Sequence, residues 1–191
     1  MPKISASTVA EHRANQRAAL VRAGEGILQE AGLAGVSPRT VCERAGLARS
    51  SFYDYFATKD DLLVAIAIDA IERWDAEIEE ALQSVDAGLP TLRAFVDATM
   101  AMTAEGKHTI ASVLRQAELS PTRFEDLMAL HDALLRPVLR VLADVGAPEP
   151  KTWAAFVEGV LGTGIRLVTL GMDHRATADK IYQLLTRGLP G

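Results

Sequence analysis

The sequence predicts an all-α protein, and three observations support this fold class. Helical periodicity of apolar residues recurs along the 191 residues, whereas sustained alternation with period two is absent. The chain contains no Asn-Gly or Asp-Gly pair of the kind that closes β-hairpins. Glycine and proline gather between the periodic segments, where helices end. We therefore expect about nine helices and no sheet.

The predicted helices follow from these signals in chain order. Residues 1–10 are small and polar, and we expect them to be loose. The first helix ends at Gly32 and Gly35, because glycine favours helix termination. The predicted helices span about 11–31, 38–45, 49–56, 59–84, 91–104, 109–117, 122–145, 152–170 and 177–188.

Several helix boundaries carry specific end signals. The Ser37 hydroxyl can cap free N–H groups, and proline at position 38 is favoured in a first helical turn. Thr58 and Asp61 have the spacing of a reciprocal capping pair at the start of the long fourth helix. Within the helix at about 122–145, Pro137 should cause a bend, because proline removes a hydrogen bond and clashes with the preceding turn.

Charge is distributed unevenly along the chain. Residues 1–60 hold eight Lys/Arg and six Asp/Glu, whereas residues 61–191 hold twelve and nineteen. This balance argues against nucleic-acid binding over the whole surface and is compatible with a local basic region. The single cysteine, Cys42, excludes an intramolecular disulfide, and we predict no metal site and no cofactor. No segment has the apolar length of a membrane span or a signal peptide, so we expect a cytoplasmic protein.

Residues 37–59 have the pattern of two short helices joined by a glycine turn, which is typical of helix-turn-helix DNA binding. Phe52 and Phe56 are spaced to hold the second helix against a core. The polar side chains at its start and free sides suit contacts with bases and nearby phosphates: Arg49, Ser50, Ser51 and Tyr53. Tyr55 and Lys59 suit phosphate contacts, because Lys59 opens a helix whose free N–H groups attract anions.

Residues 14–74 resemble the N-terminal domain of the TetR family of transcriptional regulators. The resemblance rests on the glycine-rich exit from the first helix and on these motifs: Ala45-Gly46-Leu47, the aromatic run 52–56, Thr58-x-x-Asp61 and Leu62-Leu63. It implies that Ser37, Pro38 and Arg39 begin the supporting helix near phosphates. It also implies that the family reads bases and adjoining phosphates at four positions and holds the DNA backbone at two, which are Arg49, Ser50, Ser51 and Tyr53, and Tyr55 and Lys59. Pro38 and Cys42 depart from the usual family pattern.

The resemblance implies that residues 75–191 form a helical domain for effector binding and dimerisation. Aromatic, methionine and histidine side chains could line a largely apolar pocket there, although each could equally be ordinary core: Phe95, Met100, Phe124, Met128, His131 and Trp153. Small and apolar residues of the last two helices could form a dimer interface, although they could also pack within one chain: Ala155, Gly159, Gly162, Thr163, Ile181, Leu184 and Leu185.

These features predict a dimeric, ligand-responsive repressor that binds a pseudo-palindromic DNA operator and no membrane. One alternative is a TetR-like DNA-binding protein without a small-molecule effector, which acts in chromosome organisation or under control of a protein partner. The remote alternative is an all-helical enzyme, for which the sequence offers no converging set of catalytic residues.

Overall fold

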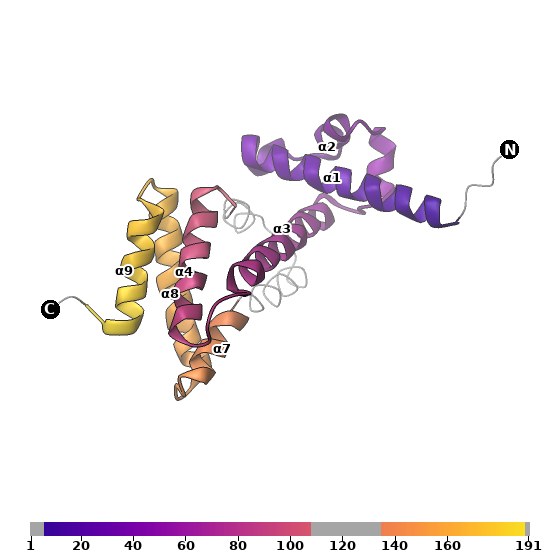
Figure 1. Ribbon diagram of the computed structural model, residues 1–191. Helices are drawn as coiled ribbons and strands as arrows, with labels where there is room; N and C mark the ends of the chain where they lie inside the picture. The colour runs from indigo at the N-terminus through magenta and orange to yellow at the C-terminus, as the bar shows by residue number, and fades with distance from the viewer. Residues whose placement is uncertain (1–5, 108–134, 190–191) are drawn as a thin grey trace. The chain divides into compact units, whose positions relative to one another are not determined.

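The computed structural model describes residues 6–107 and 135–189, which form seven α-helices and one 3-10 helix and contain no strand (Figure 1). The all-α prediction is therefore confirmed. The helix predicted at about 109–117 and the first half of the one at about 122–145 lie outside the described residues. The chain divides into two compact units, with a boundary between Ala70 and Ile71.

The first unit contains α1 (Ala6–Gly35), α2 (Pro38–Ala45), the 3-10 helix η1 (Arg49–Asp54) and the first part of α3 (Lys59–Leu82). Helices α1 and α2 pack against each other, and α2 packs against η1. Side chains from all four elements form one apolar core, including Leu20, Leu28, Val41, Phe52, Phe56, Leu62 and Ile66.

Helix α1 begins earlier than predicted. It starts at Ala6, so the expectation that residues 6–10 are loose is wrong. No glycine or proline lies between Ala6 and Arg22, and alanine has the highest helix propensity, so the helix continues toward the N-terminus. Its predicted end is confirmed, because Gly32 has φ 64° and ψ −166° and interrupts the helical backbone.

The second unit contains the rest of α3 with α4 (Leu89–Ala104), α7 (Arg136–Asp144), α8 (Pro150–Thr169) and α9 (His174–Arg187). Helix α4 packs against α7, α8 and α9 (Figure 1). The core of this unit includes Trp74, Ile78, Phe95, Met100, Val138, Leu161 and Ile181. The rings of Trp74 and Phe95 meet edge to face, with centroids 6.0 Å apart.

Gly164 allows the close packing of three helices in the second unit. A Cβ atom at this position of α8 would collide with the Ile181 side chain of α9, and it would lie 3.1 Å from Met100 Sδ of α4. In contrast, a Cβ atom at Gly159 or Gly162 would meet nothing within 4 Å. The glycines of α8 therefore face two ways: Gly164 lies inward, whereas Gly159 and Gly162 lie outward.

The bend predicted at Pro137 concerns a helix at about 122–145, of which only the part after residue 134 lies among the described residues. Helix α7 begins at Arg136, after Leu135 with φ −87° and ψ 0°, so the proline lies in its first turn. A first-turn N–H has no helical partner, and proline there costs little. Pro137, which has no N–H donor, therefore suits the start of α7.

Candidate nucleic-acid interface

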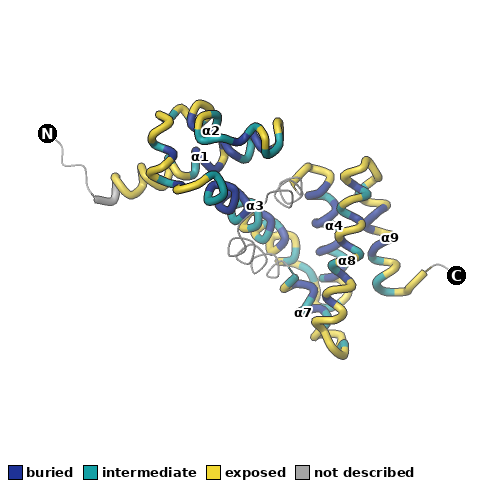
Figure 2. Tube along the Cα trace, turned by 180° about the vertical axis from the view of Figure 1, so that it is seen from behind, coloured by how far each residue is buried: buried dark blue, intermediate teal, exposed yellow. Residues whose placement is uncertain are grey.

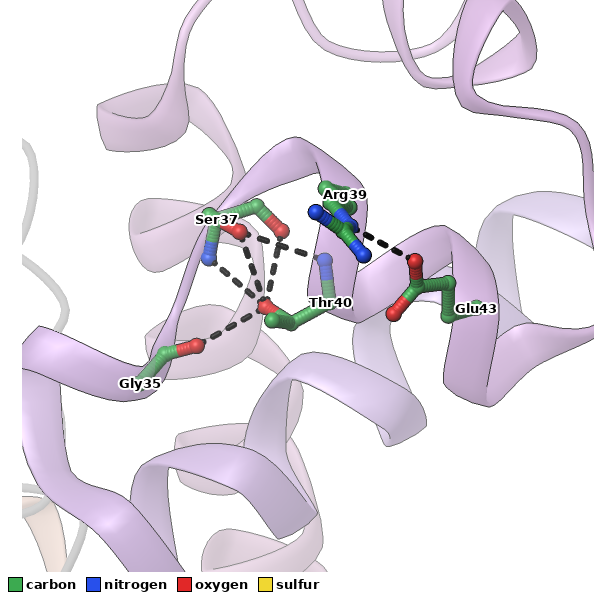
Figure 3. A network of polar contacts seen from close by, with 5 residues as sticks. All are labelled: Gly35, Ser37, Arg39, Thr40 and Glu43. Atoms are coloured by element: carbon green, nitrogen blue, oxygen red, sulfur yellow. Dashed lines mark hydrogen bonds and ion pairs between the residues drawn. The ribbon is translucent and has the colours of Figure 1, made fainter.

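The start of α2 is fixed by a network of short-range hydrogen bonds (Figure 3). The Thr40 N–H donates to Ser37 Oγ over 3.1 Å, and the Ser37 N–H donates to Thr40 Oγ1 over 3.0 Å. Thr40 Oγ1 also lies 2.8 Å from the Gly35 carbonyl oxygen, to which it donates. The predicted cap at Ser37 and Pro38 is confirmed, and the Ser37 N–H is committed to this cap.

Two arginines of α2 have carboxylate partners. Arg39 is exposed and donates from Nε to Glu43 Oε1 over 2.7 Å, which raises the pKa of its guanidinium (Figure 3). Arg44 donates from both Nη atoms to Glu30 of α1, over 2.7 and 2.5 Å, and lowers the pKa of that carboxyl. Arg44 therefore ties α2 to α1, whereas the carboxylate partner of Arg39 lies on its own helix.

The turn after α2 has the predicted geometry. Gly46 has φ 69°, a left-handed conformation that glycine adopts without a side-chain penalty. The Leu47 N–H donates to the Cys42 carbonyl over 2.9 Å, and the Leu47 side chain packs on the core. Burial raises the pKa of the Cys42 thiol, so this side chain behaves as a small apolar residue.

The element after the turn presents one face to the core and one to solvent. Phe52 is fully buried, whereas Arg49, Ser50 and Tyr53 are exposed and Ser51 is half-buried. The predicted α-helix is a six-residue 3-10 helix, η1, because so short a segment without a side-chain cap cannot offset the cost of starting an α-helix. The predicted separation into buried phenylalanines and outward polar residues is confirmed for this segment.

Tyr55 and Lys59, the predicted phosphate contacts, both have partners within the first unit. The Tyr55 hydroxyl donates to Gln16 Oε1 over 2.5 Å. Lys59 Nζ donates to the Leu33 carbonyl oxygen over 2.8 Å, where the carbonyls near the end of α1 attract a cation. An ammonium group has three protons, so this contact leaves Lys59 two further donors, whereas Tyr55 has a single proton. The role of both residues toward DNA stays a prediction.

Sequence reasoning missed three α1 residues that contact the aromatic segment. The Arg13 guanidinium lies over the Tyr55 ring at 5.5 Å, and that of Arg17 lies over the Phe56 ring at 5.3 Å. Gln16 accepts the Tyr55 hydroxyl proton. Their spacing of three and four residues, continued by buried Leu20, places them along one helix face and could have indicated them.

The predicted pocket residues of the second unit do not share one environment. Phe95 and Met100 are buried in its core. Trp153 on α8 is 48% exposed and packs edge to face against Phe156, with ring centroids 5.8 Å apart, and its place in a pocket stays a prediction. The other three predicted residues, Phe124, Met128 and His131, lie outside the described residues.

Most residues predicted for a dimer interface lie on exposed surface. Figure 2 shows an exposed face along α8, to which four of them belong: Ala155, Gly159, Gly162 and Thr163. On α9, Leu184 is exposed and Leu185 is half-buried against the core of its own unit. Ile181 is buried in that core where Gly164 makes room for it, which agrees with the alternative that it packs within one chain.

Among residues 6–107 and 135–189, no group of three or more His, Cys, Asp or Glu side chains could hold a metal ion. In the same part of the chain, no helix combines the length and apolar character that a membrane span requires.

Comparisons with known proteins agree with the helix-turn-helix geometry. The family of bacterial regulatory proteins described as the tetR family matches residues 20–66, which include α2, η1 and the start of α3. The search of curated proteins finds no match.

Solved structures resemble the chain over almost its whole length. The transcriptional regulator FadR from Bacillus subtilis, in complex with stearoyl-CoA, has a TM-score of 0.77 at 16% identity, covering 90% of this chain and 98% of its own. FadR from Bacillus halodurans gives 0.77 at 17% identity, with 91% and 96% covered. The TetR family transcriptional regulator PfmR from Thermus thermophilus gives 0.69 at 23% identity, with 91% and 99% covered.

At these identities the solved structures show the fold, and the family match supplies the relationship. Both point to transcriptional regulators and not to enzymes. Residues 20–66 therefore match the tetR family of bacterial regulatory proteins, and the chain as a whole has the fold of the transcriptional regulators FadR and PfmR.

Proposed function

We propose that the protein is a dimeric repressor that releases its operator when a small apolar molecule binds. Residues 14–74 form the DNA-binding domain in this proposal, and residues 75–191 bind the effector and the second protomer. The orientation of η1 is the observation that supports base recognition by this element. Its buried Phe52 fixes η1 on the core, while Arg49, Ser50 and Tyr53 point outward. Arginine and serine on a groove-facing element can donate to base edges.

A symmetric dimer would present two such elements to a pseudo-palindromic operator. The exposed face of α8 supports this arrangement, since Gly159 and Gly162 leave open space for another helix. Trp153 and Phe156 add aromatic surface that is 48% and 61% exposed. Exposed aromatic side chains beside small residues are typical of a helix face that packs against a partner.

The reading role of Arg49 can be tested by substitution. Arg49→Ala is expected to weaken operator binding by about 1–3 kcal/mol and to relax sequence preference, because a bidentate contact with guanine is lost. Footprinting on DNA adjoining the protein's own gene would supply the operator, and titration with matched and mutated sites would give both quantities. If the variant binds the operator with the affinity and sequence preference of the wild type, Arg49 does not contact the bases.

The Lys59→Ala variant tests the backbone contact. It is expected to weaken binding to all DNA sequences and to lower the salt slope by about one counterion. Lys180→Ala serves as the control, because it removes the same charge from an exposed position of α9. Equal salt slopes for both variants would show that Lys59 serves only its contact with the Leu33 carbonyl oxygen.

An effector would act through the equilibrium between two conformations of the protein. Helix α3 offers a route, because Ile66 lies in the first core and Trp74 and Ile78 lie in the second. The complex of Bacillus subtilis FadR with stearoyl-CoA makes that acyl-CoA a suitable first probe. We expect an effective ligand to weaken operator binding by about 5- to 150-fold.

Operator titration with stearoyl-CoA, and then with a panel of apolar molecules, measures this effect. Reciprocity requires that the operator weaken binding of the effective ligand by the same factor, which calorimetry of the complex would check. If the operator affinity stays constant throughout the panel, the alternative without a small-molecule effector is favoured.

A further inference from the structure

The reading element η1 has little stabilisation of its own. It is a six-residue 3-10 helix, the N-cap residue Ala48 that precedes it provides no side-chain cap, and Phe52 is its buried residue. Short 3-10 segments have poorer hydrogen-bond geometry than α-helices, and their last carbonyl groups lack helical partners. The orientation of η1 therefore depends on contacts with other elements.

Helix α1 supplies such contacts at the C-terminal end of η1. Arg13 Nη2 donates to the Asp54 carbonyl oxygen over 2.9 Å, and the guanidinium also lies over the Tyr55 ring at 5.5 Å. One turn later along α1, Gln16 accepts the proton of the Tyr55 hydroxyl over 2.5 Å. A cation at the carbonyl end of a helix is electrostatically favourable, and a charged donor strengthens the hydrogen bond.

We infer that Arg13 and Gln16 are positioning residues that set the specificity of DNA recognition by holding the end of η1. This inference rests on the proposed role of η1 as the reading element. Sequence-specific binding requires η1 in one orientation, whereas non-specific binding depends on charge near the phosphates. These contacts hold η1 in one orientation before DNA binds. The loss of conformational entropy on ordering η1 therefore does not reduce the free energy of operator binding.

The test compares Arg13→Met with wild type on the operator and on a scrambled duplex of equal length. We expect operator affinity to fall about tenfold, as for loss of one charge-assisted hydrogen bond, while the scrambled affinity and the salt slope stay unchanged. Arg22→Met is the matched control, since it removes the same charge from an exposed position of α1 and should keep the operator preference. Gln16→Ala should also lower the preference, because Tyr55 loses its acceptor.

Two results would overturn the inference. Equal loss on both duplexes with a smaller salt slope would make Arg13 a phosphate contact, and full rescue by Arg13→Lys would confirm that reading. An unchanged operator preference in both Arg13→Met and Gln16→Ala would show that these α1 residues do not affect sequence-specific DNA binding. If circular dichroism shows that Arg13→Met does not fold, the ratio of operator affinity to scrambled-duplex affinity in Gln16→Ala decides the question. A wild-type protein without sequence preference would instead contradict the proposed function.

Discussion

Replacing Phe52 with alanine is expected to lower the free energy of unfolding of the first unit by about 3–5 kcal/mol. The Phe52 side chain is fully buried, and its ring lies 5.7 Å from that of Phe56 and 5.4 Å from that of Tyr53. Deleting the ring removes apolar burial and leaves a cavity beneath η1. Because small domains are stable by only about 5–15 kcal/mol, operator binding should fall with the folded population. Urea denaturation followed by circular dichroism measures the change.

The neighbouring residue provides a matched control for this prediction. Tyr53 is 58% exposed, so Tyr53→Ala should change stability by less than about 1 kcal/mol while still weakening DNA binding. The two variants thus distinguish a residue that holds η1 on the core from a residue of η1 that contacts DNA. A Phe52→Ala protein as stable as Tyr53→Ala would show that η1 is not held by this core.

Replacing Phe156 with glutamate is expected to convert the proposed dimer into monomers. Phe156 is 61% exposed on α8, beside the open glycines of that helix. In a twofold interface the substitution occurs twice, so two carboxylates would lose water without a partner. We expect dimerisation to weaken by about 4 kcal/mol, or about a thousandfold. Sedimentation over a range of concentrations measures this shift.

Leu89→Glu is the control, because it also places a carboxylate at an exposed apolar position, 45% exposed at the start of α4. An acidic group is favourable at a helix N-terminus, so this variant should remain a folded dimer. If Phe156→Glu also remains dimeric at micromolar concentration, the exposed α8 face is not the interface.

Local signals predicted much of the first unit. The Ser37 cap, the glycine turn at Gly46 and the Thr58–Asp61 pair all depend on residues within a few positions of one another, and each was confirmed. The burial of Phe52 and Phe56 followed from their spacing. These features are visible in a sequence because capping and helical periodicity are properties of short segments.

Contacts between distant segments were not predictable in this way. Arg44 pairs with Glu30, and Tyr55 with Gln16, across 14 and 39 positions of the chain. The sequence offered many exposed charges of both signs, and periodicity does not say which pair will meet. The same limit applies to Ile181, whose burial depends on the space that Gly164 leaves on another helix.

The sequence by itself determined the all-α fold, the helix-turn-helix and the burial of Phe52 and Phe56, because propensity, caps and apolar spacing act locally. Only the tertiary structure decided that α1 holds the end of η1 through Arg13 and Gln16, and that Trp153 lies on the exterior. Those outcomes depend on how helices far apart in sequence pack, and packing selects among conformations that local preferences leave nearly equal in free energy.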